Sequence, residues 1–289
     1  MRHARGEVGS FQAVNHFSDL AADEWRALTQ GRRRRPAAAR RGEEAPALSA
    51  ELVASMASLP ASVNWTAGAG PKNIVADVGV KDQAQCGSCW AFATVGAVEG
   101  AWATAGNTLT SLSEQQIVSC DKKGGNAGCN GGEQITAMDW LAKQAGLCTE
   151  KDYPYTSGTG KDGVCKTTCT AAVAIKKGVE LPARNESVLL GAIALTPLSL
   201  SVDASDDKIW QSYAGGIVTE ACKCNNDNCL DHGVTAIGYG TVGGSDAYII
   251  KNSWGTDWGM LGYILLGRGA AYGPGGQCGV LIDNAYVVV

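Results

Sequence analysis

The stretch that decides the interpretation of this sequence is Gln83-Ala84-Gln85-Cys86-Gly87-Ser88-Cys89-Trp90. From Ser88 to about Thr104 the apolar residues recur at mostly helical spacing, which predicts a helix that begins near Cys89. The positive end of a helix dipole and its unpaired N–H groups favour a thiolate over a thiol. Cys89 is therefore a candidate nucleophile. Its own N–H and the side-chain amide of Gln83 are candidate donors to a developing oxyanion.

A base for this thiol must come from one of three histidines. Two of them, His3 and His16, lie near the N-terminus, ahead of an Arg- and Ala-rich stretch. His232 stands 143 residues after Cys89, where a strand is predicted to begin. Asn252 follows the apolar strand that ends at Lys251, and its side-chain oxygen could accept from the imidazole N–H. Trp254, two residues on, could shield that bond from water.

These motifs resemble the signatures of the papain/cathepsin L family of cysteine peptidases. The resemblance covers roughly Leu59 to Val289 and includes further family motifs in the right order. Upstream, Asn15–Leu20 resembles the end of the inhibitory propeptide of these enzymes, whose longer helical part we expect to precede Met1. The segments that carry the resemblance are Gln83–Trp90, Gly128–Gly132, Tyr153–Tyr155, Asp231–Gly233, Asn252–Gly255 and Cys278–Gly279.

The expected fold is α+β. Predicted helices near Ser88–Thr104, Ser113–Gln116 and Gln134–Ala145 come before most predicted strands, which argues against alternating βαβ units. The resemblance implies a papain-like two-lobed fold, with a helical left lobe, a β-barrel-like right lobe and a catalytic cleft between them. We assign residues 1–30 to a propeptide remnant, 31–58 to an exposed linker with the processing site, and 59–289 to the peptidase domain. Its helical lobe is expected at about 68–172 and its β lobe at about 173–289. The predicted strands are Ala172–Ile175, Leu198–Val202, Val234–Tyr239, Ala247–Lys251, Tyr263–Leu266 and Ala285–Val289.

The activity implied by the resemblance is hydrolysis of internal peptide bonds through a thioester acyl-enzyme, by an enzyme made as a proenzyme. Cys89 would attack, His232 would transfer protons, Asn252 would orient His232, and Gln83 would bind the oxyanion. The resemblance implies no metal and no cofactor. No inserted loop that would block one end of the cleft is evident, which favours an endopeptidase. A catalytically inactive homologue is disfavoured because every catalytic position is filled.

Substrate binding is also predicted from the resemblance. Gly131 and Gly132 would offer an open backbone edge, because glycine lets another chain approach closely. The pocket for the second residue before the scissile bond, S2, would have Asp283 as its floor. An acid there should accept Arg as well as apolar residues, with Arg gaining as Asp283 ionises. The remaining expected substrate contacts are Gln134, Leu230 and Gly233 in the walls of S2, and Trp254.

Eleven cysteines indicate an oxidising compartment and leave one thiol over. The resemblance implies Cys86–Cys129 and Cys120–Cys165, which leaves Cys148 to pair with Cys169. One of Cys222 and Cys224 would join Cys278 and the other Cys229. Two alternatives are open at this point. Cys86 and Cys89 could form a redox C-x-x-C pair, and Cys222, Cys224, Cys229 and His232 could bind zinc.

Partners and location follow from composition and the resemblance together. A net charge of −4 indicates no general affinity for nucleic acid or anionic membranes. The expected partners are protein and peptide substrates, the chain's own propeptide and proteinaceous cysteine-protease inhibitors, and a monomer is expected. A lysosomal, vacuolar or secreted location fits the cysteines. No secretory signal stands at Met1, so we expect the N-terminus to be truncated.

Overall fold

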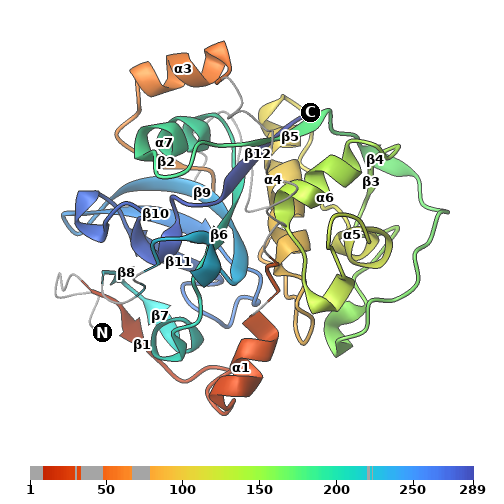
Figure 1. The fold of residues 1–289 in the computed structure, drawn as a ribbon, viewed down its shortest axis with the longest axis horizontal. Coiled ribbons are helices and arrows are strands. Elements are labelled where there is room, and N and C mark those ends of the chain that lie inside the picture. The colour runs from red at the N-terminus through yellow and green to blue at the C-terminus, as the bar shows by residue number, and fades with distance from the viewer. Residues whose placement is uncertain (1–8, 30, 34–47, 67–78, 220–221, 223) are drawn as a thin grey trace.

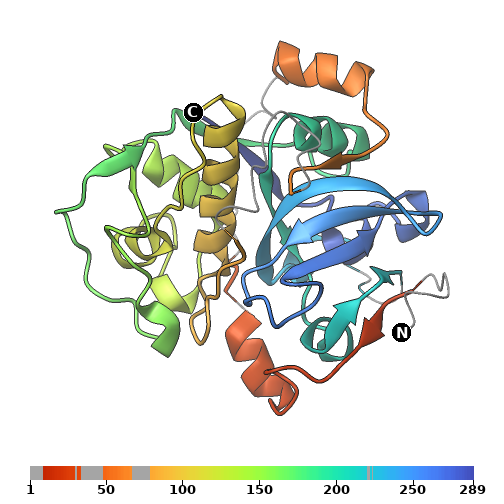
Figure 2. The same cartoon turned by 180° about the vertical axis from the view of Figure 1, so that it is seen from behind.

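The computed structural model describes residues 9–29, 31–33, 48–66, 79–219, 222 and 224–289. Two lobes lie side by side: α4, α5 and α6 on one side, and the large sheet with α7 on the other (Figures 1 and 2). Each lobe has its own main cluster of buried apolar residues. The expected two-lobed α+β fold is thereby confirmed.

The helical lobe is built around α4, Cys89–Thr104, which is buried along most of its length. Ser113 caps α5, Glu114–Cys120, by accepting from the Gln116 N–H. Glu133 caps α6, Gln134–Leu141, in the same way. All three helices match the sequence predictions, although α6 ends earlier than expected. A short ribbon of β3, Leu147–Cys148, and β4, Ala171–Val173, closes the outer side of this lobe.

The second lobe contains an eight-stranded sheet in the order β5-β12-β6-β9-β10-β11-β8, with β2 also paired to β9. Along the described chain this sheet is open, because no pairing joins its two ends into a barrel. Its long central strand, β9, begins at His232, so the sheet delivers a candidate catalytic residue to the cleft. The strands are β2 (Val63–Asn64), β5 (Lys177–Glu180), β6 (Leu198–Val202), β8 (Ile217–Val218), β9 (His232–Val242), β10 (Ser245–Lys251), β11 (Tyr263–Gly267) and β12 (Asn284–Val288).

One helix of this lobe has no counterpart among the predictions. Helix α7 spans Glu186–Leu195 and is capped by the Asn185 side chain, which accepts from the Val188 N–H. The Asn185 cap followed by Glu186 and an apolar run was a readable signal for a helix start.

The N-terminal segment, Phe11–Trp25, lies against the rest of the chain, where Phe17 and Trp25 belong to the apolar core of the second lobe (Figure 1). Strand β1, Phe11–Gln12, pairs with β7, Tyr213–Gly215, and helix α1 spans Ala22–Thr29. Residues Gly31–Arg33 then enter the cleft between the lobes.

Residues 31–58, predicted as an exposed linker, are described only at their two ends: residues 49–58 are mostly exposed but helical, and Gly31 and Arg32 are buried. Helix α3, Ala50–Ala57, is capped by Ser49 and packs on α7, where the Ser55 hydroxyl donates to the Gly191 carbonyl at 2.9 Å. Leu52 and Met56 of α3 lie against Gly191 of α7, and two apolar residues are too few to show a helical period. Residues 34–47 of the predicted linker, which include Arg34 and Arg35 of the arginine run Arg32–Arg35, lie outside the described residues. Within the described residues, no helix has the length and apolar character needed to cross a membrane.

Candidate active site

Cys89 occupies the first turn of α4, at the floor of the cleft, and it is the only cysteine of the described chain outside a disulfide. The neighbouring Cys86 is joined to Cys129, which ties the loop before α4 to the Gly128–Gly132 segment. This pairing overturns the redox alternative, which required a bond between Cys86 and Cys89. The thiol is fully buried, because Gly31 of the N-terminal segment lies directly over it.

His232 reaches the same place from the other lobe. The residue after it, Gly233, lies against the backbone of Cys89, so the start of β9 meets the start of α4. The ring nitrogen Nε2 of His232 is 2.8 Å from Oδ1 of Asn252. Because an amide oxygen can only accept, Nε2 carries the proton of the neutral ring, and Nδ1 is the nitrogen that can take another.

Trp254 covers this bond as expected. Its ring stacks on His232, with centroids 4.6 Å apart and planes 28° apart. Trp254 is itself surrounded by aromatic rings, including Trp258 at 4.8 Å and Trp25 of the N-terminal segment, also at 4.8 Å. The His232–Asn252 pair therefore lies in an apolar, water-excluding environment.

Gln83 is buried in the loop before α4, and both the nitrogen and the oxygen of its side-chain amide are hydrogen-bonded. Its Nε2 donates to the carbonyl oxygens of Cys86 at 3.0 Å and of Leu28 at 3.1 Å. Its Oε1 accepts from the Ser253 hydroxyl, which fixes the direction of the amide. The side-chain amide of Gln83, a candidate oxyanion donor, thus already donates to the Leu28 carbonyl of the N-terminal segment.

The backbone edge predicted at Gly131 and Gly132 is present and occupied. The Gly132 N–H donates to the Gly31 carbonyl at 2.9 Å, and the Arg33 N–H donates to the Gly132 carbonyl at 2.6 Å. These two bonds flank Arg32 and form a parallel bridge. The Arg32 N–H donates in turn to the carbonyl of Asp231 at 3.0 Å. The N-terminal segment therefore spans the cleft from one lobe to the other.

The residues predicted for S2 lie around the Arg32 side chain and the groups behind it. Asp283 accepts from Arg32 Nη2 at 2.8 Å and from the Ser201 hydroxyl at 2.7 Å. Gln134 Nε2 donates to the same Ser201 hydroxyl at 3.1 Å and lies against Gly233. Leu230 is buried next to Gly279 and precedes the Asp231 carbonyl that holds Arg32.

A second acid in this pocket was missed by the sequence reasoning. Arg32 Nη2 also donates to Asp227 Oδ1 at 2.5 Å, and Nη1 donates to the Asp227 carbonyl at 3.2 Å. Asp227 begins a short 3₁₀ turn, Asp227–Cys229, in the loop before His232. The sequence shows that Asp227 is acidic and lies shortly before His232, but neither property predicts where its side chain points.

Burial controls the charges at this site. It raises the pKa of the Cys89 thiol to about 12, although N–H groups of Gly233, Trp90 and Gly31 oppose the shift. Burial also raises the pKa of Asp231 to about 7. The pKa of Glu133 is raised to about 7 by burial first and then by the nearby Asp283. Burial disfavours the charge on Arg32, but Asp283 and Asp227 outweigh it and raise its pKa above the ordinary value.

The cysteines near His232 are all in disulfides. Cys222 is joined to Cys278, and Cys224 to Cys229. These bonds remove the three thiols of the zinc alternative. The remaining pairs, Cys120–Cys165 and Cys148–Cys169, are those expected.

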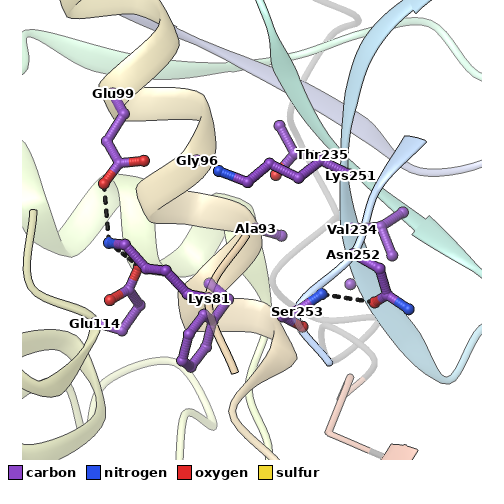
Figure 3. Close-up of a pocket in the computed structure, with 12 residues that line it drawn as sticks. Lys81, Ala93, Gly96, Glu99, Glu114, Val234, Thr235, Lys251, Asn252 and Ser253 are labelled. Atoms are coloured by element: carbon purple, nitrogen blue, oxygen red, sulfur yellow. Dashed lines mark hydrogen bonds and ion pairs between the residues drawn. The ribbon is translucent and has the colours of Figure 1, made fainter. Parts of the chain in front are cut away.

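Behind Asn252 the two lobes enclose a cavity of about 20 Å³, enough for one water (Figure 3). On its helical side Lys81 Nζ lies 2.9 Å from Glu99 and 2.7 Å from Glu114, so these two acids form a buried ionic cluster with Lys81. Lys251 lines the other side, and its burial lowers its pKa. The cavity therefore has the ionic cluster on its helical side and Lys251 and Asn252 on the other side.

Comparisons with known proteins agree with this geometry. The model of the papain family cysteine proteases matches residues 59–288. Germination-specific cysteine protease 1 of Arabidopsis thaliana is 40% identical over 95% of this chain and 70% of its own length.

Two similar solved structures are a proform and an inhibitor complex. The proform of Amb a 11, a cysteine protease and ragweed pollen allergen, superposes with a TM-score of 0.82 and 33% identity, covering 97% of this chain and 80% of that one. Bromelain from Ananas comosus in complex with the E64 inhibitor gives a TM-score of 0.70 and 34% identity, covering 80% of this chain and 100% of that one.

Proposed function

Because the chain belongs to the papain family of cysteine proteases, we propose that it cleaves internal peptide bonds with Cys89, His232, Asn252 and Gln83 as its catalytic residues. The single observation that carries this proposal is the His232–Asn252 bond, placed where β9 meets the buried Cys89 thiol. The reaction begins when a proton has passed from the thiol to His232 Nδ1. The resulting thiolate is stabilised by the imidazolium and by the N-terminus of α4.

The chemistry then runs in two steps. The Cys89 sulfur bonds to the carbonyl carbon, and the carbonyl oxygen becomes an oxyanion held by the Gln83 amide and the Cys89 N–H. The C–N bond breaks as His232 gives its proton to the leaving amine, which leaves a thioester. His232 next removes a proton from water, the hydroxide replaces sulfur at the carbon, and the thiol is restored. Asn252 holds the imidazole in the required orientation throughout.

We propose further that S2 accepts both apolar and basic residues, with Asp283 as the acidic floor. Support comes from Arg32, which lies between the two bonds to Gly132 and places its guanidinium against Asp283. The segment runs parallel to Gly132, so Arg32 imitates the side chain of a substrate residue but not its chain direction. An ionised carboxylate in a partly desolvated pocket pairs strongly with a guanidinium.

The chain is, in this proposal, the proenzyme of that peptidase. Residues Phe11–Arg33 act as the inhibitory part, because Leu28 uses an oxyanion donor and Gly31 covers the thiol. Processing after Arg33 then opens the cleft. The five disulfides support action in a vacuole, lysosome or extracellular space, where thiols become oxidised.

The test is stoichiometric labelling of the processed protein with an epoxide inhibitor of the E-64 type. One label per chain, on Cys89, is expected, together with loss of activity on a fluorogenic peptide. Cys89→Ala should show neither labelling nor activity, and His232→Ala should retain the thiol but label far more slowly. Processed protein whose Cys89 is not labelled would refute the peptidase mechanism.

A further inference from the structure

A short disulfide-closed loop contributes to the S2 region. The loop runs from Cys224 to Cys229 and includes one turn of 3₁₀ helix, Asp227–Cys229, which Asn226 caps. The Asn226 side chain accepts from the Asn228 N–H, so the loop is held by a covalent bond and by its own capping bond. It is therefore a fixed wall of the cleft and can hold the Asp227 side chain in one place.

The contacts of Arg32 are divided between this loop and the end of the peptidase chain. Three acceptors meet its two terminal nitrogens, and two of the three belong to Asp227: the carboxylate on Nη2 and the backbone carbonyl on Nη1. The third is the Asp283 carboxylate on Nη2. The Arg32 side chain has no exposed surface, and the side chains of Asp227 and Asp283 are only 12% and 11% exposed. The charge is thus enclosed by two carboxylates from separate parts of the chain.

We propose that Asp227 is a second specificity-determining residue of this peptidase and that, with Asp283, it makes S2 select arginine over lysine as well as over leucine. This inference rests on the proposed function of S2. Asp227 extends the acidic contact from one carboxylate to two and adds a backbone acceptor. A planar guanidinium can present separate N–H groups to acceptors at both of its terminal nitrogens. A lysine ammonium presents a single nitrogen and is more strongly hydrated, so it gains less in the same enclosed site.

The other charged groups around the pocket favour a cationic guest in the same way. Glu133 is buried close to Asp283, and Asp231 is largely buried beside the Arg32 backbone. Without a cation, carboxylates this close repel one another, and one of them is favoured to take a proton. An apolar side chain such as leucine leaves that repulsion in place. Arginine removes it, which adds to its advantage over leucine.

The experiment compares kcat/KM of the processed enzyme for three fluorogenic peptides that differ only in carrying Arg, Lys or Leu at the S2 position. The variants are Asp227→Asn and Asp283→Asn. The matched control is Asp246→Asn, whose carboxylate also pairs with an arginine, Arg268 at 2.8 Å, but at the far end of β10. Asp227→Ser serves as a second variant if the Asn substitution impairs folding.

We expect Asp227→Asn to lower kcat/KM for the Arg peptide by roughly ten- to hundredfold, the range for a lost hydrogen bond to a charged group. The Leu peptide should change by less than about threefold, and the preference for Arg over Lys should largely disappear. Asp283→Asn should also reduce cleavage of the Arg peptide, and Asp246→Asn should change none of the three values.

Each other outcome has a definite meaning. Loss of Arg cleavage in Asp283→Asn but not in Asp227→Asn would refute the role of Asp227 and leave the proposed S2 function intact. Equal loss for all three peptides in Asp227→Asn would show a role in folding and would also overturn the inference. A wild-type enzyme that cleaves Leu but not Arg would overturn the proposed S2 function itself.

Discussion

The N-terminal segment holds the peptidase domain at two regions of opposite character. At the first, Phe17 and Trp25 pack edge-on against Trp254, with ring centroids 5.8 and 4.8 Å away. At the second, the guanidinium of Arg32 lies between Asp227 and Asp283. The first region is apolar, and Trp25 is completely buried in it. The second consists of charges.

The two regions should therefore differ in how their contribution to docking of the segment depends on pH. Burial of aromatic surface is favourable over the whole physiological pH range, so the first region should hold the segment in place under all these conditions. Ion pairs depend on protonation, so the second region should weaken in acid. Both regions contact groups that the proposed mechanism uses, Trp254 over the His232–Asn252 bond and Asp283 in S2. One segment therefore covers the catalytic residues and the specificity pocket together.

Removing both regions at once should have the largest effect. Because burial raises the pKa of the Cys89 thiol to about 12, the thiol stays protonated and covered in the full chain. Near pH 8, iodoacetamide should alkylate Cys89 roughly a thousandfold more slowly in the full chain than after processing beyond Arg33. Intact-mass spectrometry of full-length molecules measures both rates. Equal rates would mean that the segment does not cover the thiol in solution.

Breaking the apolar region alone should have the next largest effect. Trp25→Ala removes a fully buried indole, at a cost of about 3–5 kcal/mol to docking of the segment. Alkylation of Cys89 in the full chain should accelerate by roughly a hundredfold or more, because opening becomes easier by that free energy. Trp25→Phe should recover most of the protection. If Trp25→Ala alkylates like the wild type, the cleft is held by Gly31–Arg33 alone.

Breaking the charged region alone should have a smaller effect. Arg32→Ala deletes hydrogen bonds between charged groups, and the loss should be about 1.5–3 kcal/mol, or roughly ten- to hundredfold in the alkylation rate. Arg32→Lys should recover only part of the lost protection, because an ammonium has one nitrogen and cannot donate from two separate nitrogens to Asp227 and Asp283. As a matched control, Arg268→Ala breaks the pair with Asp246 and should leave the rate unchanged. A rate for Arg32→Lys equal to that of the wild type would show that only charge matters there.

The smallest expected effect is the pH dependence of the docking of the N-terminal segment. The pKa values of Glu133 and Asp231 are raised to about 7 by burial, and the charge of Arg32 lowers both. By linkage, docking of Arg32 is strongest when these carboxyls are ionised, above about pH 7, and weakens as they gain protons below it. From about pH 8 to pH 5 the protection of Cys89, relative to processed enzyme at each pH, should fall a few-fold. Glu133→Gln should flatten this dependence, and an unchanged profile in that variant would exclude Glu133 as a contributor.

Sequence motifs identified the proposed chemistry because each is a local requirement. Cys89 at a helix start, His232 at a strand start and Asn252 after a strand are each readable within a few residues. The strand Leu198–Val202 was predicted with its observed bounds, because its alternation of apolar residues and serines is a local strand pattern. Helix α3 was not predicted, because its stability comes from Leu52 and Met56 packing on a glycine of α7, more than a hundred residues away.

The sequence by itself, through its resemblance to a known family, determined the family and the fold class, and it predicted three of the five disulfides and the candidate residues around Cys89. The structure decided that Cys222 pairs with Cys278 and Cys224 with Cys229. Only the tertiary structure decided that Arg32 enters the cleft, that Asp227 joins Asp283 around it, and that Leu28 and Gly31 cover Gln83 and Cys89. These contacts join residues up to 251 positions apart. They depend on how two lobes and a returning segment pack in space, a relation that no local pattern encodes.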